Sequence, residues 1–165
     1  KNQDEYVCQV EEADIIVLAK STGVLEFTTG TYGQEICVDS IIKGNEWIDE
    51  NETCWIWRSY GMEVMDGQIV YRNVLNLMQD DGTYLVFLNS NQLNQYRTEK
   101  EFQTASEYFG YLPIEGAKVQ PIKENQRNVL YKEWSEIPVF ISSEKVAAAW
   151  NEIAEMLLNK FEPDA

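Results

Sequence analysis

Strand-type segments fill most of this chain, and a helical pattern occurs only at its C-terminal end. Residues 13–20 (ADIIVLAK) form a short apolar run rich in β-branched side chains, which is typical of a strand buried on both faces. Further strand candidates are residues 34–42, 53–60, 68–75 and 83–89. Because strands and helices do not alternate along the chain, a doubly wound sheet is disfavoured, and a small closed or partly open β-barrel is predicted.

The side-chain pattern of residues 34–42 assigns the two faces of that strand. Ile36, Val38 and Ile42 are predicted to share one face, and Lys43-Gly44-Asn45 to end the strand with turn chemistry. Residues 26–33, which contain two glycines, indicate a turn. Asp66-Gly67 is a hairpin-type turn signal, and Asp80-Asp81-Gly82 is another sharp turn.

Three further stretches are predicted to join or edge the strands. Residues 46–52 carry four acidic residues around Trp47 and indicate an exposed loop. Residues 90–107 are polar and predict a long loop, of a length that is often functional or mobile. Short strands are expected at 108–113 and 117–122, at edges or ends of the sheet because prolines accompany them.

The helix is predicted over residues 143–161, with Ser142 or Ser143 as its cap. Its apolar residues repeat at three- and four-residue steps, a stripe that must cover a sheet or barrel: Val146, Ala149, Trp150, Ile153, Leu157 and Phe161. Residues 1–5 are all polar and indicate a solvated lead-in or the end of a tether. The chain starts without Met, as a processed or trimmed piece would.

Length and charge bound the class of protein. A chain of 165 residues predicts one domain, with a barrel over about 10–141 and the helix after it. The net charge of −15 disfavours nucleic acid and anionic membrane surfaces as partners, and no window is apolar enough to span a membrane. No His is present, which excludes Ser-His-Asp and Cys-His nucleophile systems. No metal or cofactor is expected.

Three cysteines, Cys8, Cys37 and Cys54, match no metal or redox spacing. An odd number leaves at least one free thiol, so they are interpreted mainly as small buried residues. A disulfide from Cys8 to either Cys37 or Cys54 is the alternative. A reactive thiol is disfavoured because few cationic side chains lie nearby in the sequence.

The strand from Ala13 to Lys20, and a second strand ending in Ile-Ile-Lys-Gly at 41–44, resemble the first half of the netrin-like module. That module is the OB-type barrel of the tissue inhibitors of metalloproteinases. The pattern is also similar to extracytoplasmic proteins of Gram-positive bacteria, with counterparts at 38–44, 59–61 and 84–88 and closing strands near 110–116. The resemblance spans about residues 10–122 and implies a five-stranded OB-type Greek-key barrel outside the cytoplasm.

The inhibitory mechanism of that family does not carry over. The metalloproteinase inhibitors chelate the enzyme's zinc through an N-terminal Cys in a Cys-x-Cys start, whereas Cys8 lies seven residues inside this chain. The resemblance therefore implies the barrel and an extracytoplasmic location, in a secreted or envelope-tethered protein such as a lipoprotein. It implies no inhibitory site.

Aromatic side chains are the candidate binding residues. On the 53–60 strand, Trp55 and Trp57 share one face and could stack on a sugar or a hydrophobic peptide, while Tyr60 lies on the other face. The preferred interpretation, however, is that the C-terminal helix covers both rings through Trp150 and Phe161, because its apolar stripe must be buried. Arg58 of the same strand is interpreted as pairing with a neighbouring acid.

The 90–107 loop and the acidic turns offer weaker candidates. Tyr96 and Arg97, with Phe102, could contact a partner, but a disordered or decorative insertion is the preferred interpretation of this loop. Oxygen ligands for calcium could come from Asp49, Glu50 and Glu52 or from Asp80 and Asp81, but solvated acidic loops are the preferred interpretation. Paired carboxylates are the minimum for a glycosidase, and 28 acidic residues make some such pair unavoidable.

The predicted function is that of a non-enzymatic binding domain. It would recognise a protein, peptide or glycan through aromatic anchors and an acidic rim, without covalent chemistry. Two alternatives stay open: a protease-inhibitor-like module, and a glycan hydrolase that uses paired carboxylates.

Overall fold

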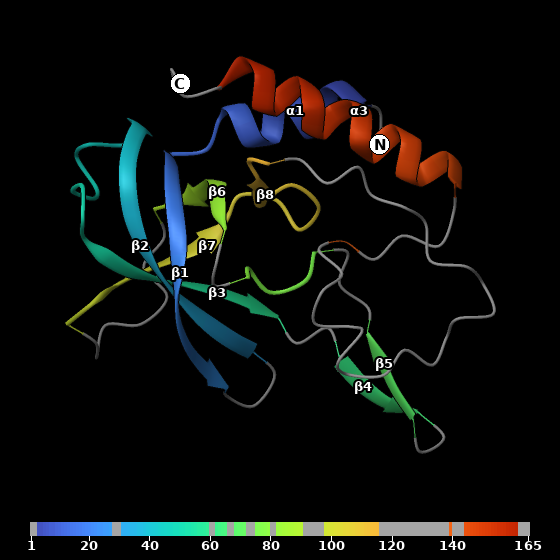
Figure 1. The fold of residues 1–165 in the computed structure, drawn as a ribbon, viewed down its shortest axis with the longest axis horizontal. Coiled ribbons are helices and arrows are strands. Elements are labelled where there is room, and N and C mark those ends of the chain that lie inside the picture. Colours follow the sequence, from blue (N-terminus) through green and yellow to red (C-terminus); the bar gives the residue numbers. More distant parts are fainter. Residues whose placement is uncertain are drawn as a thin grey trace.

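Five strands close into a ring (Figure 1). The computed structural model describes residues 3–27, 31–59, 62–65, 68–71, 75–79, 82–90, 98–115, 139 and 144–161. The ring consists of β1 (Ile15–Phe27), β2 (Thr31–Lys43), β3 (Thr53–Ser59), β7 (Lys100–Thr104) and β6 (Thr83–Asn89), in that order, and β6 pairs back onto β1. β3 and β7 run parallel, and every other neighbouring pair in the ring is antiparallel.

This arrangement is the five-stranded OB-type Greek-key barrel that the sequence predicts. The first three strands form a meander, and the fourth and fifth return to close it against β1 and β3. The chain is therefore mainly β with a C-terminal helix. A sixth strand, β8 (Tyr111–Pro113), extends the sheet beside β6.

A separate hairpin, β4 (Met62–Met65) and β5 (Gln68–Tyr71), pairs Met65 with Gln68 across the two residues of the predicted Asp-Gly turn. The predicted strand at 68–75 is shorter than expected, because β5 ends at Tyr71 and Leu75 forms only an isolated bridge to Val139. The predicted strand at 117–122 lies outside the described residues.

β1 and β2 are longer than predicted, so the predicted 26–33 turn begins and ends inside strands. β2 also contains extra residues. Val38 pairs with Ala19 and Ser40 with Leu18, so Asp39 is skipped in the backbone register with β1 and forms a β-bulge, although its carboxylate reaches Lys20 of β1 at 3.5 Å. A second irregularity at Ile42 shifts the register again, and Ile42 is 41% exposed. The prediction that Ile42 shares the buried face of Ile36 was wrong for this reason.

The prediction of an unbroken loop over 90–107 was also wrong, because β7 lies inside it. Its pattern, KEFQT, has one large apolar residue, Phe102, which is buried in the core. A strand this short and polar is stabilised mainly by its neighbours, and β7 is paired to β3 on one edge and to β6 on the other.

The N-terminal residues form a helix, α1 (Gln3–Glu11), where the sequence predicted a solvated lead-in. Isolated helices of this length are marginal in water. Val10 is fully buried in the core, and α1 lies beside the C-terminal helix α3 (Glu144–Lys160), with Glu11 and Lys160 forming an ion pair (Figure 1). Tertiary packing therefore accounts for α1.

Helix α3 confirms the predicted element, but its buried face is rotated from the predicted stripe. Val146 is 54% exposed, and the prediction that it faces the barrel was wrong. The buried residues of the helix are Ala147, Trp150, Ile153, Ala154 and Leu157.

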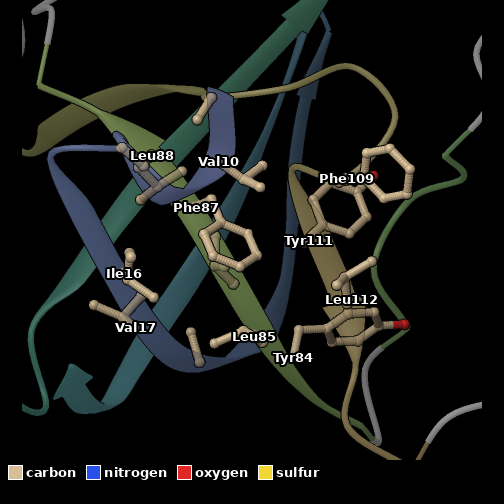
Figure 2. Packing of buried hydrophobic residues seen from close by; sticks show 14 of the residues in the cluster. Val10, Ile16, Val17, Tyr84, Leu85, Phe87, Leu88, Phe109, Tyr111 and Leu112 are labelled. Carbon is tan, nitrogen blue, oxygen red and sulfur yellow. The ribbon is translucent and has the colours of Figure 1, made fainter. Parts of the chain in front are cut away.

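The core fills the barrel and continues under the helices. Ile16 of β1 shares one face of the β1–β6 pair with Leu85 and Phe87 of β6, and Val17 takes the opposite face (Figure 2). Phe109 and other residues between β7 and β8 carry the cluster towards the helices. The predicted central strand 83–89 matches β6 in both bounds, and all five residues between its ends are buried.

Candidate interaction surface

Trp55 and Trp57 lie on the outer face of β3, as the alternation predicted. Cys54 and Ile56 on the opposite face are buried in the core. The two indole rings stack with their centroids 6.2 Å apart and their planes 26° apart. Trp57 is registered with Gly33 of β2, and a Cβ on that glycine would lie 2.9 Å from two atoms of the Trp57 ring. Glycine at 33 therefore lets the Trp57 ring lie on the β2 backbone.

These two rings do not form an open platform. Trp55 is only 6% exposed, and Trp57 is half-buried. The prediction that α3 covers them through Trp150 and Phe161 was wrong. Trp150 instead stacks on Phe109 at 5.6 Å, and Phe161 meets Phe87 edge-on at 5.7 Å.

β7 extends the outer face of β3. Glu101 is registered with Trp55, and Gln103 with Trp57, so both β7 side chains share the face of the indoles. Glu101 is buried and Gln103 is exposed. On the β2 side, Glu35 is registered with Trp55 and accepts a hydrogen bond from the Thr22 hydroxyl at 2.8 Å. The neighbours registered with Trp57 itself are thus the exposed Gln103 on β7 and Gly33 on β2.

The loop from Gly44 to Glu52 holds the most exposed tryptophan among those the structure describes. Trp47 is 40% exposed, while its neighbour Ile48 is buried in the core. The Lys100 ammonium donates to the Trp47 carbonyl oxygen at 2.8 Å and forms an ion pair with Glu52 at 3.1 Å. Sequence reasoning placed Trp47 in an exposed loop but did not consider it a binding residue. A tryptophan among four acids in a short loop was the available signal.

Glu52 is a structural residue of this loop. Burial would raise the pKa of its carboxyl, but the Asp49 backbone N–H and the Lys100 ammonium outweigh burial, and the pKa is lowered. This corrects the interpretation of residues 46–52 as simply solvated. No group of three or more His, Cys, Asp or Glu side chains that could hold a metal ion occurs among the residues that the structure describes.

The other predicted binding residues, Tyr60, Tyr96 and Arg97, lie outside the described residues, as do Asp80 and Asp81. Phe102 is buried in the core and is not available to a partner.

Arg58 is buried on the core side of β3, where it ties distant segments to the barrel. Its guanidinium donates to the backbone carbonyls of Leu75 and Glu107, at 3.2 and 3.1 Å, and to the Tyr111 hydroxyl at 2.9 Å. These bonds join β3 to the segment before β6 and to the segment before β8. We therefore interpret Arg58 as a structural residue that holds these segments against the barrel.

All three cysteines are free thiols, so neither predicted disulfide from Cys8 is formed. Cys8 is exposed on α1, Cys37 is half-buried on the outer face of β2, and Cys54 is buried in the core. The interpretation of all three as buried residues therefore holds only for Cys54. Because β2 residue Cys37 is registered with Thr53, it points to the opposite face from Cys54.

Comparisons with known proteins assign no family. No protein-family model matches the chain, and a search of curated proteins found no significant match. The netrin-like resemblance therefore stays a prediction. Within the described part of the chain, no helix has the length and apolarity needed to cross a membrane.

Proposed function

We propose that this chain is a non-enzymatic binding domain of a secreted or envelope-tethered protein. It recognises a protein, peptide or glycan partner by surface complementarity. The extracytoplasmic location rests on the resemblance to proteins of Gram-positive bacteria. The strong negative charge supports a partner other than nucleic acid.

The observation that carries the proposal is the position of Trp57. It lies half-buried on the outer face of β3, with its ring on Gly33 and stacked on Trp55. OB-type barrels bind their ligands across the face of their second and third strands, which correspond to β2 and β3 here. A tryptophan held in one orientation by its neighbours offers contact area to a ligand at low entropic cost.

A screen for ligands tests the proposal. The wild-type chain and a Trp57→Phe variant, which keeps an aromatic ring on Gly33, are applied to a glycan array and to a displayed-peptide library. We expect at least one class of ligand to bind the wild type, and to bind the variant more weakly by about three- to thirtyfold. Circular dichroism must first show that the variant folds.

Two outcomes would contradict the proposal. One is hydrolysis of an array glycan that is lost in a single Asp→Asn or Glu→Gln variant, which would identify a glycan hydrolase. The other is inhibition of a purified protease by the chain in a tight complex, which would identify an inhibitor module. Absence of any ligand in both screens would also count against a binding domain.

A further inference from the structure

The loop between β2 and β3 displays a tryptophan that its backbone holds in place. The indole of Trp47 is 40% exposed, a large apolar area to leave in water. It lies on the loop that joins two strands of the barrel and does not belong to the strand face that carries Trp57. Exposed tryptophans are among the side chains enriched at binding hot spots.

Hydrogen bonds fix this loop at both ends and in its middle. The Trp47 backbone N–H donates to the Gly44 carbonyl at 2.9 Å, and the Trp47 carbonyl accepts from Lys100. Asn51, with a left-handed φ of 64°, donates from its backbone N–H to the Val38 carbonyl at 2.7 Å. Ile48 anchors the loop in the core. A partner would therefore meet a pre-organised loop and would lose little entropy in ordering it.

Gly44 allows the loop to leave β2 in this direction. Its φ is +107°, and a Cβ there would lie 2.9 Å from the Asp14 carbonyl oxygen and 3.0 Å from the Cα of Ile15. Only glycine combines that backbone angle with so close an approach. The position of Trp47 relative to the barrel is thus set by contacts on both sides of the loop.

The charge around Trp47 selects the kind of partner. Glu46, Asp49 and Glu50 are exposed within three residues of it, and residues 44–52 contain no Lys or Arg. The nearby cation Lys100 is engaged by Glu52 and by the Trp47 carbonyl, and Lys43 donates to the Glu11 carbonyl at 3.5 Å. Exposed carboxylates one to three residues from an exposed indole favour a guanidinium or ammonium ligand, because both kinds of group attract a cation.

We propose that the 44–52 loop docks an arginine- or lysine-bearing segment of a partner protein, with Trp47 as the aromatic anchor and Glu46, Asp49 and Glu50 as the acidic rim. This inference rests on the proposed binding function but uses a different surface from the Trp57 face. The exposed indole locates the binding site, and charge complementarity with the acidic rim indicates a cationic ligand.

Binding of a synthetic hexa-arginine peptide tests the proposal, with hexa-citrulline as a neutral peptide of similar shape. We expect titration calorimetry at low salt to detect hexa-arginine and not hexa-citrulline. Trp47→Ala should weaken binding by about tenfold, which is the loss of a desolvated cation–π contact. Tyr108→Ala is the matched control, because Tyr108 is 39% exposed and lies far along the chain on another loop. It should change the affinity by less than about twofold.

A pair of double variants separates docking on this loop from general attraction to an acidic protein. Glu46→Gln with Glu50→Gln removes two charges from the rim, and Glu12→Gln with Glu155→Gln removes two exposed charges elsewhere. We expect the rim variant to lose several times more affinity than the control variant. Equal losses, or equal losses from Trp47→Ala and Tyr108→Ala, would overturn the proposal, as would failure of the wild type to bind hexa-arginine.

Fluorine NMR of the fluorotryptophan-labelled protein gives an independent readout. Trp47→Phe assigns one resonance, and that resonance should shift on addition of hexa-arginine while the resonance assigned through Trp57→Phe does not. The reverse pattern would overturn this inference and leave the Trp57 face as the binding site. If the proposed binding function itself is wrong, no ligand will bind either the 44–52 loop or the Trp57 face.

Discussion

The side-chain amide of Gln34 pairs with the backbone of Met78 at both its donor and its acceptor. Its Nε2 donates to the Met78 carbonyl at 2.8 Å, and its Oε1 accepts from the Met78 N–H at 3.0 Å. Gln34 is buried on β2, so one side chain satisfies two backbone groups of the segment that precedes β6. The amide thus supplies the Met78 backbone with the two hydrogen bonds that a neighbouring strand would otherwise make.

Replacing Gln34 should therefore be costly. Gln34→Glu keeps the size of the side chain but removes the donor, leaving the Met78 carbonyl without that bond and placing a carboxylate in the core. We expect the free energy of unfolding to fall by about 2–4 kcal/mol. Urea denaturation followed by circular dichroism measures it. Gln103→Glu, the same change at an exposed site, is the control and should change the stability by less than about 0.5 kcal/mol.

Gly33 should not tolerate a side chain, because the Trp57 ring occupies the space of its Cβ. Gly33→Ala is expected to destabilise the protein by about 1–3 kcal/mol and to expose Trp57 more to water. Thermal unfolding and acrylamide quenching of tryptophan fluorescence measure the two effects. Gly82→Ala serves as the comparison, since its added Cβ would only reach an ordinary contact at 3.5 Å from Tyr84. Equal effects of the two substitutions would refute the close packing of Trp57 on β2.

Stability should depend on the ionisation of Asp14. Its carboxylate accepts the backbone N–H of Ser90 at 2.9 Å and the Ser90 hydroxyl at 2.8 Å, and these bonds lower the pKa of Asp14 below its ordinary value of 3.8. A group whose pKa is lower in the folded state stabilises the fold above its unfolded pKa. That contribution is lost as the pH falls through the folded pKa.

We therefore expect Asp14→Asn to be less stable than the wild type at pH 7 and to approach it as the pH falls below the ordinary Asp pKa of 3.8. Urea midpoints across this range measure the difference. The Ser90→Ala variant should raise the pKa of Asp14, which carbon-detected NMR can follow. A stability difference that stays constant between pH 7 and pH 2.5 would show that the Asp14 charge is not involved.

The three thiols should differ in reactivity. Burial raises the pKa of the Cys54 thiol to about 12, so only about one molecule in ten thousand is a thiolate there at pH 8. We expect dithionitrobenzoate to label Cys8 first in the folded protein, and Cys54 only at the rate of unfolding. Cys8→Ser should remove the fastest phase and leave the slowest unchanged. Rapid reaction of all three thiols in the folded state would contradict the burial of Cys54.

The local sequence pattern was sufficient to predict several elements. Residues 84–88 are a continuous apolar run, and β6 extends one polar residue beyond it at each end, to Thr83 and Asn89. The faces of β3 also follow from alternation, since Cys54 and Ile56 enter the core and Trp55 and Trp57 do not. The helix over 143–161 was predicted from its spacing, although its buried face includes Ala147 and Ala154, which carry too little apolar area to mark it.

Other elements have weak local signals. α1 is polar and short, and β7 contains one large apolar residue, so neither stands out from the surrounding loops. The exposure of Ile42 depends on two irregularities in β2 that appear only in the pairing with β1. Each of these features depends on neighbours that are distant in the sequence.

From the sequence alone follow the mainly β class with a C-terminal helix, the acidic charge and the placement of Trp55 and Trp57 on one strand face. These follow from composition and from periodicities within one segment. The tertiary structure decided that β7 lies parallel to β3, that Trp55 is buried, and that Lys100 holds the loop on which Trp47 is exposed. The physical reason is that strand register, burial and long-range ion pairs arise from contacts between segments, and a single segment's pattern contains no record of its neighbours.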